Sequence, residues 1–161
     1  MTKPDFVYVT YITTTPEKVW QALVDTDVAS QYWTGPNDYG PAHVNVSDWK
    51  PGSSWEHQLL DEGRTVHITG KVLESNPPHR LVITWARPQE ADDDSKHSRV
   101  SFDIAAQSDG TVRLTVTHED LQGDPKMLGG ISNGWPKVLS NLKTLLETGR
   151  TRPLTPVSAG S

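Results

Sequence analysis

The chain has 161 residues, a length that suits one domain with a sizeable buried core. Hydrophobic residues make up 34% and charged residues 22%, so the composition is too balanced for wholesale disorder. The formal net charge of −5 disfavours nucleic acids and anionic membrane surfaces as partners, and the lack of cysteine excludes disulfide frameworks, zinc ribbons and thiol nucleophiles.

The first predicted element is a strand over residues 6–12, where β-branched and aromatic residues predominate. A short helix follows, with a threonine N-cap and Pro16 in its first turn. A second helical turn, which Gly35-Pro36 ends, is expected to carry Val28, Tyr32 and Trp33. The predicted order at the beginning of the chain is therefore strand, helix, helix.

Between residues 43 and 119 the apolar period changes to two, and turn residues recur at short intervals. Ser108-Asp109-Gly110 forms the clearest hairpin turn, and residues 88–96 are expected to be a polar loop. The pattern predicts an antiparallel meander with one apolar and one polar face. Its strands are expected at roughly 43–47, 54–60, 65–75, 80–87, 97–107 and 111–119.

The last predicted element is an amphipathic helix from Asp124-Pro125 to about Gly149, whose apolar stripe would cover the apolar face of the sheet. Pro136 lies inside it, and proline costs about 3 kcal/mol in a helix interior, so a kink or break is expected there. One domain over residues 1–149 and a mobile tail over 150–161 are predicted.

The chain shows neither a signal-peptide pattern nor an apolar stretch of membrane-spanning length. A cytoplasmic protein that does not enter membranes is therefore predicted. The histidines lack metal-ligand spacing, and no phosphate-cradling glycine loop or nucleophile elbow occurs. The sequence thus predicts no metal site, no cofactor and no catalytic constellation.

The elements together predict an α+β helix-grip fold, a curved antiparallel sheet wrapped around a long C-terminal helix. A curved sheet cannot meet a straight helix everywhere, so a cavity between them is the expected site. Several segments stand in a distinctive order, namely Thr15-Pro16-Glu17-Lys18-Val19-Trp20, Tyr32-Trp33, Pro51-Gly52-Ser53-Ser54-Trp55, Gly70-Lys71-Val72-Leu73-Glu74, Pro77-Pro78-His79-Arg80-Leu81-Val82-Ile83-Thr84-Trp85, Leu114-Thr115-Val116-Thr117-His118 and Gly134-Trp135.

This combination resembles the SRPBCC (START-like, helix-grip) superfamily. Within that superfamily it is similar to the heat-shock protein 90 ATPase activator homologue-like family. The resemblance covers about residues 5 to 149. It implies the helix-grip fold and a cavity that in many relatives holds small, largely apolar molecules. Relatives also include enzymes and chaperone partners, so the fold does not settle the function.

His118 ends the apolar alternation of the last strand, so its imidazole is expected to point toward the helix. It either anchors the strand end, contacts a ligand or moves a proton. Tryptophans near the expected cavity would suit a flat, partly aromatic ligand whose polar edge meets His118 and Tyr32. The predicted ligand-binding residues are Tyr32, Trp33, His57, Ile68, Ile83, Trp85, Phe102, Leu114, Val116, His118, Ile131, Trp135 and Leu139.

The leading hypothesis is non-catalytic binding of a lipid-like, polyketide-like or flavonoid-like molecule in this cavity, with a role in stress response. A first alternative, resting on the resemblance alone, is an interaction module that stimulates a chaperone ATPase. A second is a cyclase or hydratase in which His118 is the general base and Glu74 lies nearby.

Overall fold

The computed structural model describes residues 5–25, 28, 32, 43–59, 62–121 and 125–149, except for the side chain of Asn133. Val28 and Tyr32 are helical. The rest of the predicted second helical turn, including Trp33, lies outside the described residues, and so does the predicted tail over 150–161.

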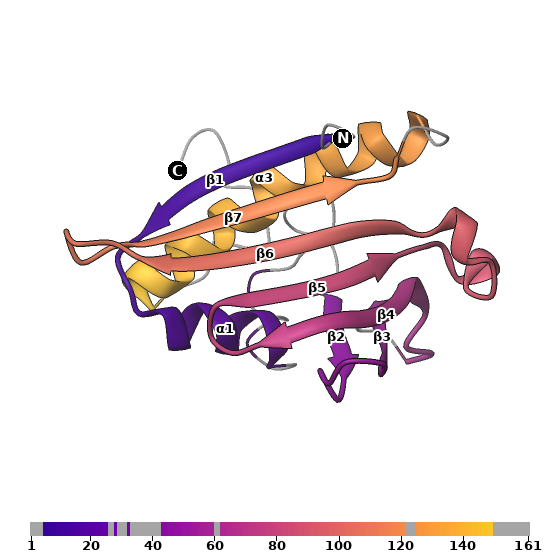
Figure 1. Cartoon of the computed structure of the whole chain (residues 1–161), viewed down its shortest axis with the longest axis horizontal. Helices are drawn as coiled ribbons and strands as arrows, with labels where there is room; N and C mark the ends of the chain where they lie inside the picture. The colour runs from indigo at the N-terminus through magenta and orange to yellow at the C-terminus, as the bar shows by residue number, and fades with distance from the viewer. Residues whose placement is uncertain are drawn as a thin grey trace, which may run out of the picture.

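Seven antiparallel strands form one sheet in the order β1-β7-β6-β5-β4-β3-β2. Figure 1 shows β1, β7, β6 and β5 side by side, with β2 and β3 at the opposite end of the sheet. The predicted meander is confirmed, since each strand ends within two residues of its expected bounds. The strands are β1 (Phe6–Ile12), β2 (His43–Ser47), β3 (Ser54–Leu59), β4 (Val66–Asn76), β5 (Arg80–Trp85), β6 (Ser98–Ala106) and β7 (Val112–Glu119).

Two irregularities lie in the β2–β5 half of the sheet. The pairing of β3 with β4 shifts between His57 and Gln58, and the pairing of β4 with β5 shifts between Val72 and Glu74. β-bulges bend and twist the strands that carry them. The pairing of β5, β6, β7 and β1 shows no such shift.

Helix α1 (Pro16–Val24) begins where the sequence predicts it, because the Thr15 side chain accepts a hydrogen bond from the Lys18 amide. Helix α3 (Pro125–Thr148) lies behind the sheet, along β1 and β7 (Figure 1). The predicted polar loop contains two short 3₁₀ helices, η1 (Pro88–Glu90) and η2 (Asp94–Lys96).

The predicted break at Pro136 does not occur, since α3 continues through it as one helix of 24 residues. Proline removes one backbone hydrogen bond, to the carbonyl four residues earlier. The apolar stripe of α3 is buried against the sheet on both sides of this position, at Ile131, Trp135, Val138, Leu139, Leu142 and Leu145. Burial of this stripe outweighs the local cost, because each large apolar side chain contributes about 1.5–3 kcal/mol.

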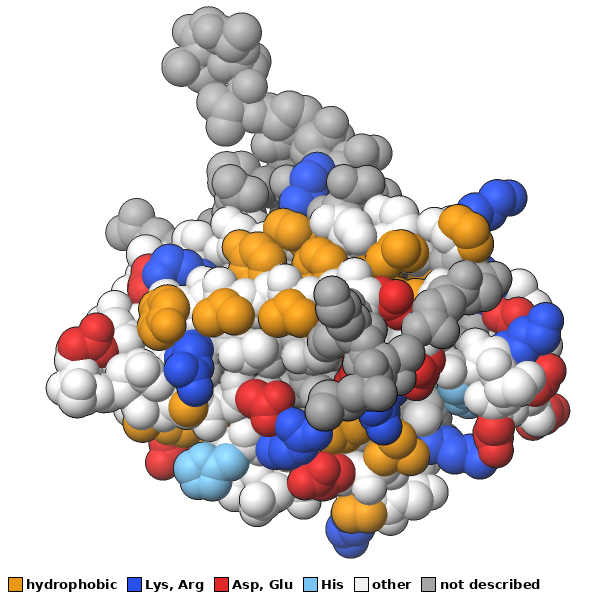
Figure 2. Space-filling view, turned by 45° about the horizontal axis from the view of Figure 1, so that its top comes forward, with side chains coloured by type: hydrophobic (Ala, Val, Ile, Leu, Met, Phe, Trp, Pro, Cys, Tyr) orange, Lys and Arg blue, Asp and Glu red, His pale blue; other side chains and the backbone are white. Residues whose placement is uncertain are grey.

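The outward face of the sheet is polar along β4, β5 and β6, where Arg80 pairs with Glu74 and Asp103. The outward face of β1 is different: Val7, Val9 and Tyr11 are 52%, 47% and 49% exposed. Figure 2 shows hydrophobic side chains gathered in a band on this side of the molecule. The sheet therefore ends in an apolar edge strand at β1.

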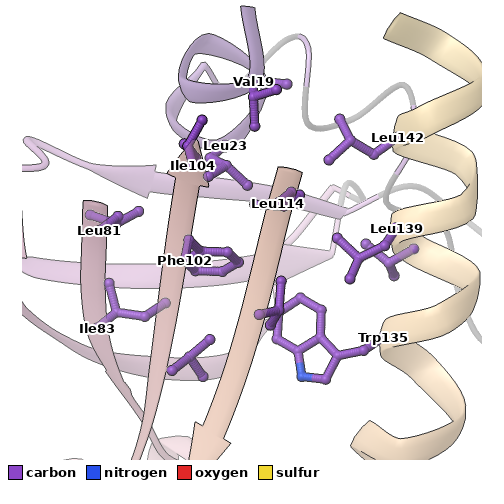
Figure 3. Packing of buried hydrophobic residues seen from close by; sticks show 14 of the residues in the cluster. Val19, Leu23, Leu81, Ile83, Phe102, Ile104, Leu114, Trp135, Leu139 and Leu142 are labelled. Atoms are coloured by element: carbon purple, nitrogen blue, oxygen red, sulfur yellow. The ribbon is translucent and has the colours of Figure 1, made fainter. Parts of the chain in front are cut away.

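The core lies between the inward face of the sheet and the two helices. Figure 3 shows Phe102 and Leu114 from the sheet facing Trp135, Leu139 and Leu142 from α3, with Val19 and Leu23 of α1 closing one end. All of these side chains are at most 4% exposed. The alternation seen in the sequence thus gives the inward face of the strands correctly.

At Gly70 the backbone of β4 lies close to both the backbone of β5 and the Trp55 ring. The indole nitrogen of Trp55 donates to the Thr84 carbonyl at 2.7 Å, across the backbone of Gly70. A Cβ atom on Gly70 would lie 2.0 Å from the Thr84 oxygen and 2.6 Å from the indole nitrogen. Only glycine leaves room for this hydrogen bond.

We expect Gly70→Ala to lower the free energy of unfolding by about 3 kcal/mol, because the added methyl group displaces either the Trp55 ring or the β5 backbone. Denaturant unfolding measures the loss. Gly63→Ala is the matched control, because a Cβ there meets nothing closer than 4.0 Å. Equal stability of the two variants within about 0.5 kcal/mol would contradict this account.

Candidate functional site

Four of the predicted site residues meet at the end of the sheet where β5 and β7 finish. Trp85 lies at the centre, with its ring centroid 5.5 Å from that of His118, 5.4 Å from Trp135 and 6.3 Å from His57. The Trp55 ring, which the sequence analysis did not select, lies 5.5 Å away on another side. Four aromatic rings from β3, β7 and α3 thus surround one indole.

His118 is fully buried, and both of its ring nitrogens have partners. The Trp135 indole donates to Nδ1 at 3.2 Å, so Nδ1 carries no proton. Nε2 then carries the proton and donates to the Ser98 hydroxyl at 2.8 Å, and that hydroxyl donates to the Trp85 carbonyl at 3.1 Å. One tautomer therefore satisfies every polar group in a chain from α3 through β7 and β6 to β5.

This geometry favours the anchoring role of His118 over the two other roles. Burial lowers its pKa to about 4, and the Asp5 carboxylate opposes the shift only in part. The ring is neutral at pH 7 and has no free nitrogen to take a proton from a substrate. Glu74, the proposed partner for acid–base work, is exposed and pairs with Arg80.

Trp33 lies outside the described residues, and the remaining predicted residues are core side chains. The Tyr32 hydroxyl donates to the Ala22 carbonyl at 2.7 Å, and burial raises its pKa. It is therefore already paired, rather than available to the polar edge of a ligand. Ile68 is half-buried, and the others are buried in the cluster between the sheet and the helices: Ile83, Phe102, Leu114, Val116, Ile131 and Leu139.

Three imidazoles form a row beside Trp85 on β2, β3 and β4. The rings of His43 and His57 stack at 4.6 Å, and His43 Nε2 lies 3.0 Å from Nδ1 of exposed His67. His57 donates through Nδ1 to the Asn45 side-chain oxygen at 2.7 Å. Burial lowers the pKa of His43 to about 4 and that of His57 well below its usual value, and the neighbouring imidazoles lower both further.

Two buried polar atoms in this region lack a partner among the residues that the structure describes. They are the indole nitrogen of Trp85 and Nδ1 of His43, on side chains that are 7% exposed. An unpaired buried donor costs about 1–3 kcal/mol, so such atoms are uncommon in folded proteins. Both belong to the inner surface of the β2–β5 half.

A small pocket lies on the same inner surface. It has a volume of about 10 Å³, room for about one water molecule, and is lined by Leu23, Asn45, Trp49, Trp55, Leu81, Ile83 and Phe102. Trp49 is half-buried and has a φ of 55°, an outlier for so bulky a residue. Strain of this kind concentrates at functional sites.

Residues 13–147 match the sequence model of a family described as activator of Hsp90 ATPase homolog 1-like proteins. The chain belongs to this family. No curated protein matches the sequence. The expected resemblance is thereby confirmed, and the strand order and long C-terminal helix described above are those of a helix-grip domain.

The fold is also similar to that of several solved proteins. An HSP90 activator from Plasmodium falciparum is 19% identical, with a TM-score of 0.66 over 88% of this chain and 94% of that one. The Aha1 dimer from Colwellia psychrerythraea is 19% identical, with a TM-score of 0.68 over 89% and 96%. CalU16 from Micromonospora echinospora is 18% identical, with a TM-score of 0.66 over 92% and 69%. Such likeness shows the fold.

Besides Trp55 and Ser98, the sequence analysis missed four residues that shape this site. Asn45 and His43 lie on β2, whose alternation is too short to assign a face, and Trp49 follows it in a loop. Asp5 precedes β1, yet it is the carboxylate that acts on the His118 pKa. The pairing of His43 with Leu59 and of Asn45 with His57 follows from the register of β2 and β3, which a single strand does not reveal.

Within the described ranges, no group of three His, Cys, Asp or Glu side chains is arranged to hold a metal ion. His43 and His67 point their nitrogens at each other instead. No helix among the described residues is both long and apolar enough to cross a membrane.

Stability is expected to fall as the pH drops from about 6.5 toward 4, by up to about 1.4 kcal/mol per pH unit for each buried histidine. The unfolded chain binds protons at His43, His57 and His118 in this range, whereas the folded protein keeps them neutral. Urea unfolding at several pH values measures the slope. His118→Gln is expected to remove one histidine's share of it.

His79→Gln is the control, since His79 is exposed at the turn between β4 and β5 and should leave the slope unchanged. If His118→Gln kept the full wild-type slope, His118 would not be the neutral buried group described above.

Proposed function

We propose that this protein binds a small planar molecule, largely apolar but with a hydrogen-bond acceptor on one edge, against the inner surface of β2–β5. The single observation that carries the proposal is the buried indole N–H of Trp85, which has no acceptor among the described residues. An acceptor on a ligand would remove the cost of that unpaired donor.

The surroundings of Trp85 support an aromatic ligand. The Trp55 and His57 rings lie beside Trp85, and Trp55 also lines the pocket together with Trp49. Ring contacts with an aromatic ligand contribute about 0.5–1.5 kcal/mol each. Asn45 adds a polar group to the pocket wall. This composition, mostly apolar with few polar atoms, is typical of small-molecule sites.

The pocket must widen to admit such a ligand, because drug-sized ligands occupy roughly 300 Å³ or more. Trp49 is the side chain best suited to move. It is half-buried in the loop between β2 and β3, and its backbone conformation is costly, so its displacement gives up less than that of a fully packed core residue. We therefore assign Trp49 as the wall that opens.

We expect flavone, which has a ketone acceptor, to bind about tenfold more tightly than 2-phenylnaphthalene, a hydrocarbon of similar shape, because one hydrogen bond is worth about 1–1.5 kcal/mol. Trp85→Phe keeps an aromatic ring and removes the N–H. It is expected to weaken flavone binding about tenfold and to leave 2-phenylnaphthalene binding nearly unchanged. Titrations followed by amide chemical shifts measure both affinities.

Trp20→Phe is the matched control, since Trp20 lies half-buried on α1, away from the pocket lining. The proposal fails if neither compound shifts the amide signals of β3–β5. It also fails if Trp85→Phe and Trp20→Phe have equal effects on flavone.

A second candidate function is stimulation of the ATPase of Hsp90. The family description and the likeness to an HSP90 activator from Plasmodium falciparum favour it. A role in stress response would follow from this function.

Under this second function, ATP turnover by the Hsp90 of the same organism is expected to rise with added protein and then to saturate. A coupled ATPase assay measures it, with the Hsp90 inhibitor-sensitive rate as the signal and heat-denatured protein as control. Unchanged turnover at a large excess of protein would end this candidate.

A further inference from the structure

We propose that two copies of this chain associate through β1, pairing their edge strands antiparallel about Val9. The inference is independent of the ligand site, since β1 and β2–β5 lie at opposite ends of the sheet. It rests on three features of β1: the direction of its free backbone groups, its lack of protecting residues, and its symmetry.

The odd-numbered residues of β1 direct their backbone groups away from β7. The Tyr11 carbonyl accepts a hydrogen bond from the Lys143 ammonium group, and the Thr13 amide donates to the Glu147 carboxylate at 2.9 Å. Both partners belong to α3 rather than to the sheet. Because backbone direction alternates along a strand, the N–H and C=O groups of Val7 and Val9 also face the open edge.

Edge strands of natural proteins are normally protected by charged side chains, proline or a bulge within the strand. Residues 6–12 contain no charged side chain and no proline. The Lys143–Glu147 pair protects only the end of the edge, at Tyr11 and Thr13. The other edge strand, β2, is shorter and carries polar His43, Asn45 and Ser47. Of the two edge strands, β1 is therefore better suited to pair with another strand.

A two-fold axis at Val9 gives a register in which every open group has a partner. Val9 faces Val9 of the second copy, and Val7 faces Tyr11. The three odd residues of each copy then exchange six backbone hydrogen bonds. The Tyr11 oxygen keeps its bond to Lys143, because a carbonyl accepts two hydrogen bonds.

The same register joins two apolar surfaces. Val7, Val9 and Tyr11 are each about half exposed on the outward face, and pairing places a small side chain against the large one and valine against valine. A second copy supplies an equally uncharged strand, and the Lys143 and Glu147 charges at the end of the edge already pair with each other. The contact involves one strand per copy, which places it among weak, concentration-dependent interfaces.

Amide hydrogen exchange of the full chain, from low micromolar to millimolar concentration, tests the pairing directly. At a chain concentration of ten times the dissociation constant about one fifth of the chains are monomeric, so the amides of Val7, Val9 and Tyr11 are expected to exchange about fivefold more slowly. The amides of Tyr8, Thr10 and Ile12 already bond to β7 and should change little. Sedimentation equilibrium over the same range is expected to show a monomer–dimer equilibrium.

Val9→Lys is expected to abolish both the dimer and the slow exchange, since a charge in the centre of the edge opposes its own copy. Leu73→Lys is the matched control: Leu73 is 49% exposed on β4, away from this edge, and should keep the dimer. Val7→Lys provides a second edge variant should Val9→Lys unfold.

Three results would overturn the proposal. A chain that stays monomeric at millimolar concentration has no such pairing, even if an extended peptide from another protein binds the edge. A dimer that survives Val9→Lys and Val7→Lys uses another surface. Equal slowing of odd and even amides of β1 would also contradict edge pairing.

Discussion

The hydrogen-bonded chain from Trp135 through His118 and Ser98 to the Trp85 carbonyl is the interaction on which the arrangement of this domain depends. It is a polar connection inside an apolar core, and it fixes how far α3 lies along the sheet. Apolar contacts alone tolerate sliding, because one leucine can replace another as a neighbour. A buried donor and acceptor tolerate no such displacement without the cost of an unpaired group.

That connection also divides the sheet into two parts. On one side β1, β6 and β7 pair without register shifts and are covered by α3. On the other side β3 and β4 carry bulges, and Gly70 lets the Trp55 indole cross a strand. Two polar atoms there have no partner in the described part of the chain. The regular part provides stability, whereas the irregular part offers the groups with which a ligand can interact.

Much of this fold is predictable from the sequence, because the period of apolar residues reflects which face is buried. The alternation at Val112, Leu114, Val116 and His118 predicts an inward-facing histidine, and the structure places it there. The unbroken α3 is less predictable, since the local cost of Pro136 is visible in the sequence while the packing that offsets it is tertiary. Trp49 and Asn45 are missed for a similar reason, because a loop and a short strand have no period to interpret.

The sequence by itself determined the order of the strands and the inward face of β4 to β7, because these follow from local spacing and residue type, and its resemblance indicated the family. Only the tertiary structure decided that His118 is engaged at both nitrogens and that the Trp85 indole N–H has no acceptor among the described residues. It also decided that the pocket between described side chains holds about one water molecule. Whether a buried polar atom has a partner, and how large a cavity is, depend on distances between residues far apart in the chain. A local pattern of residue types does not give those distances.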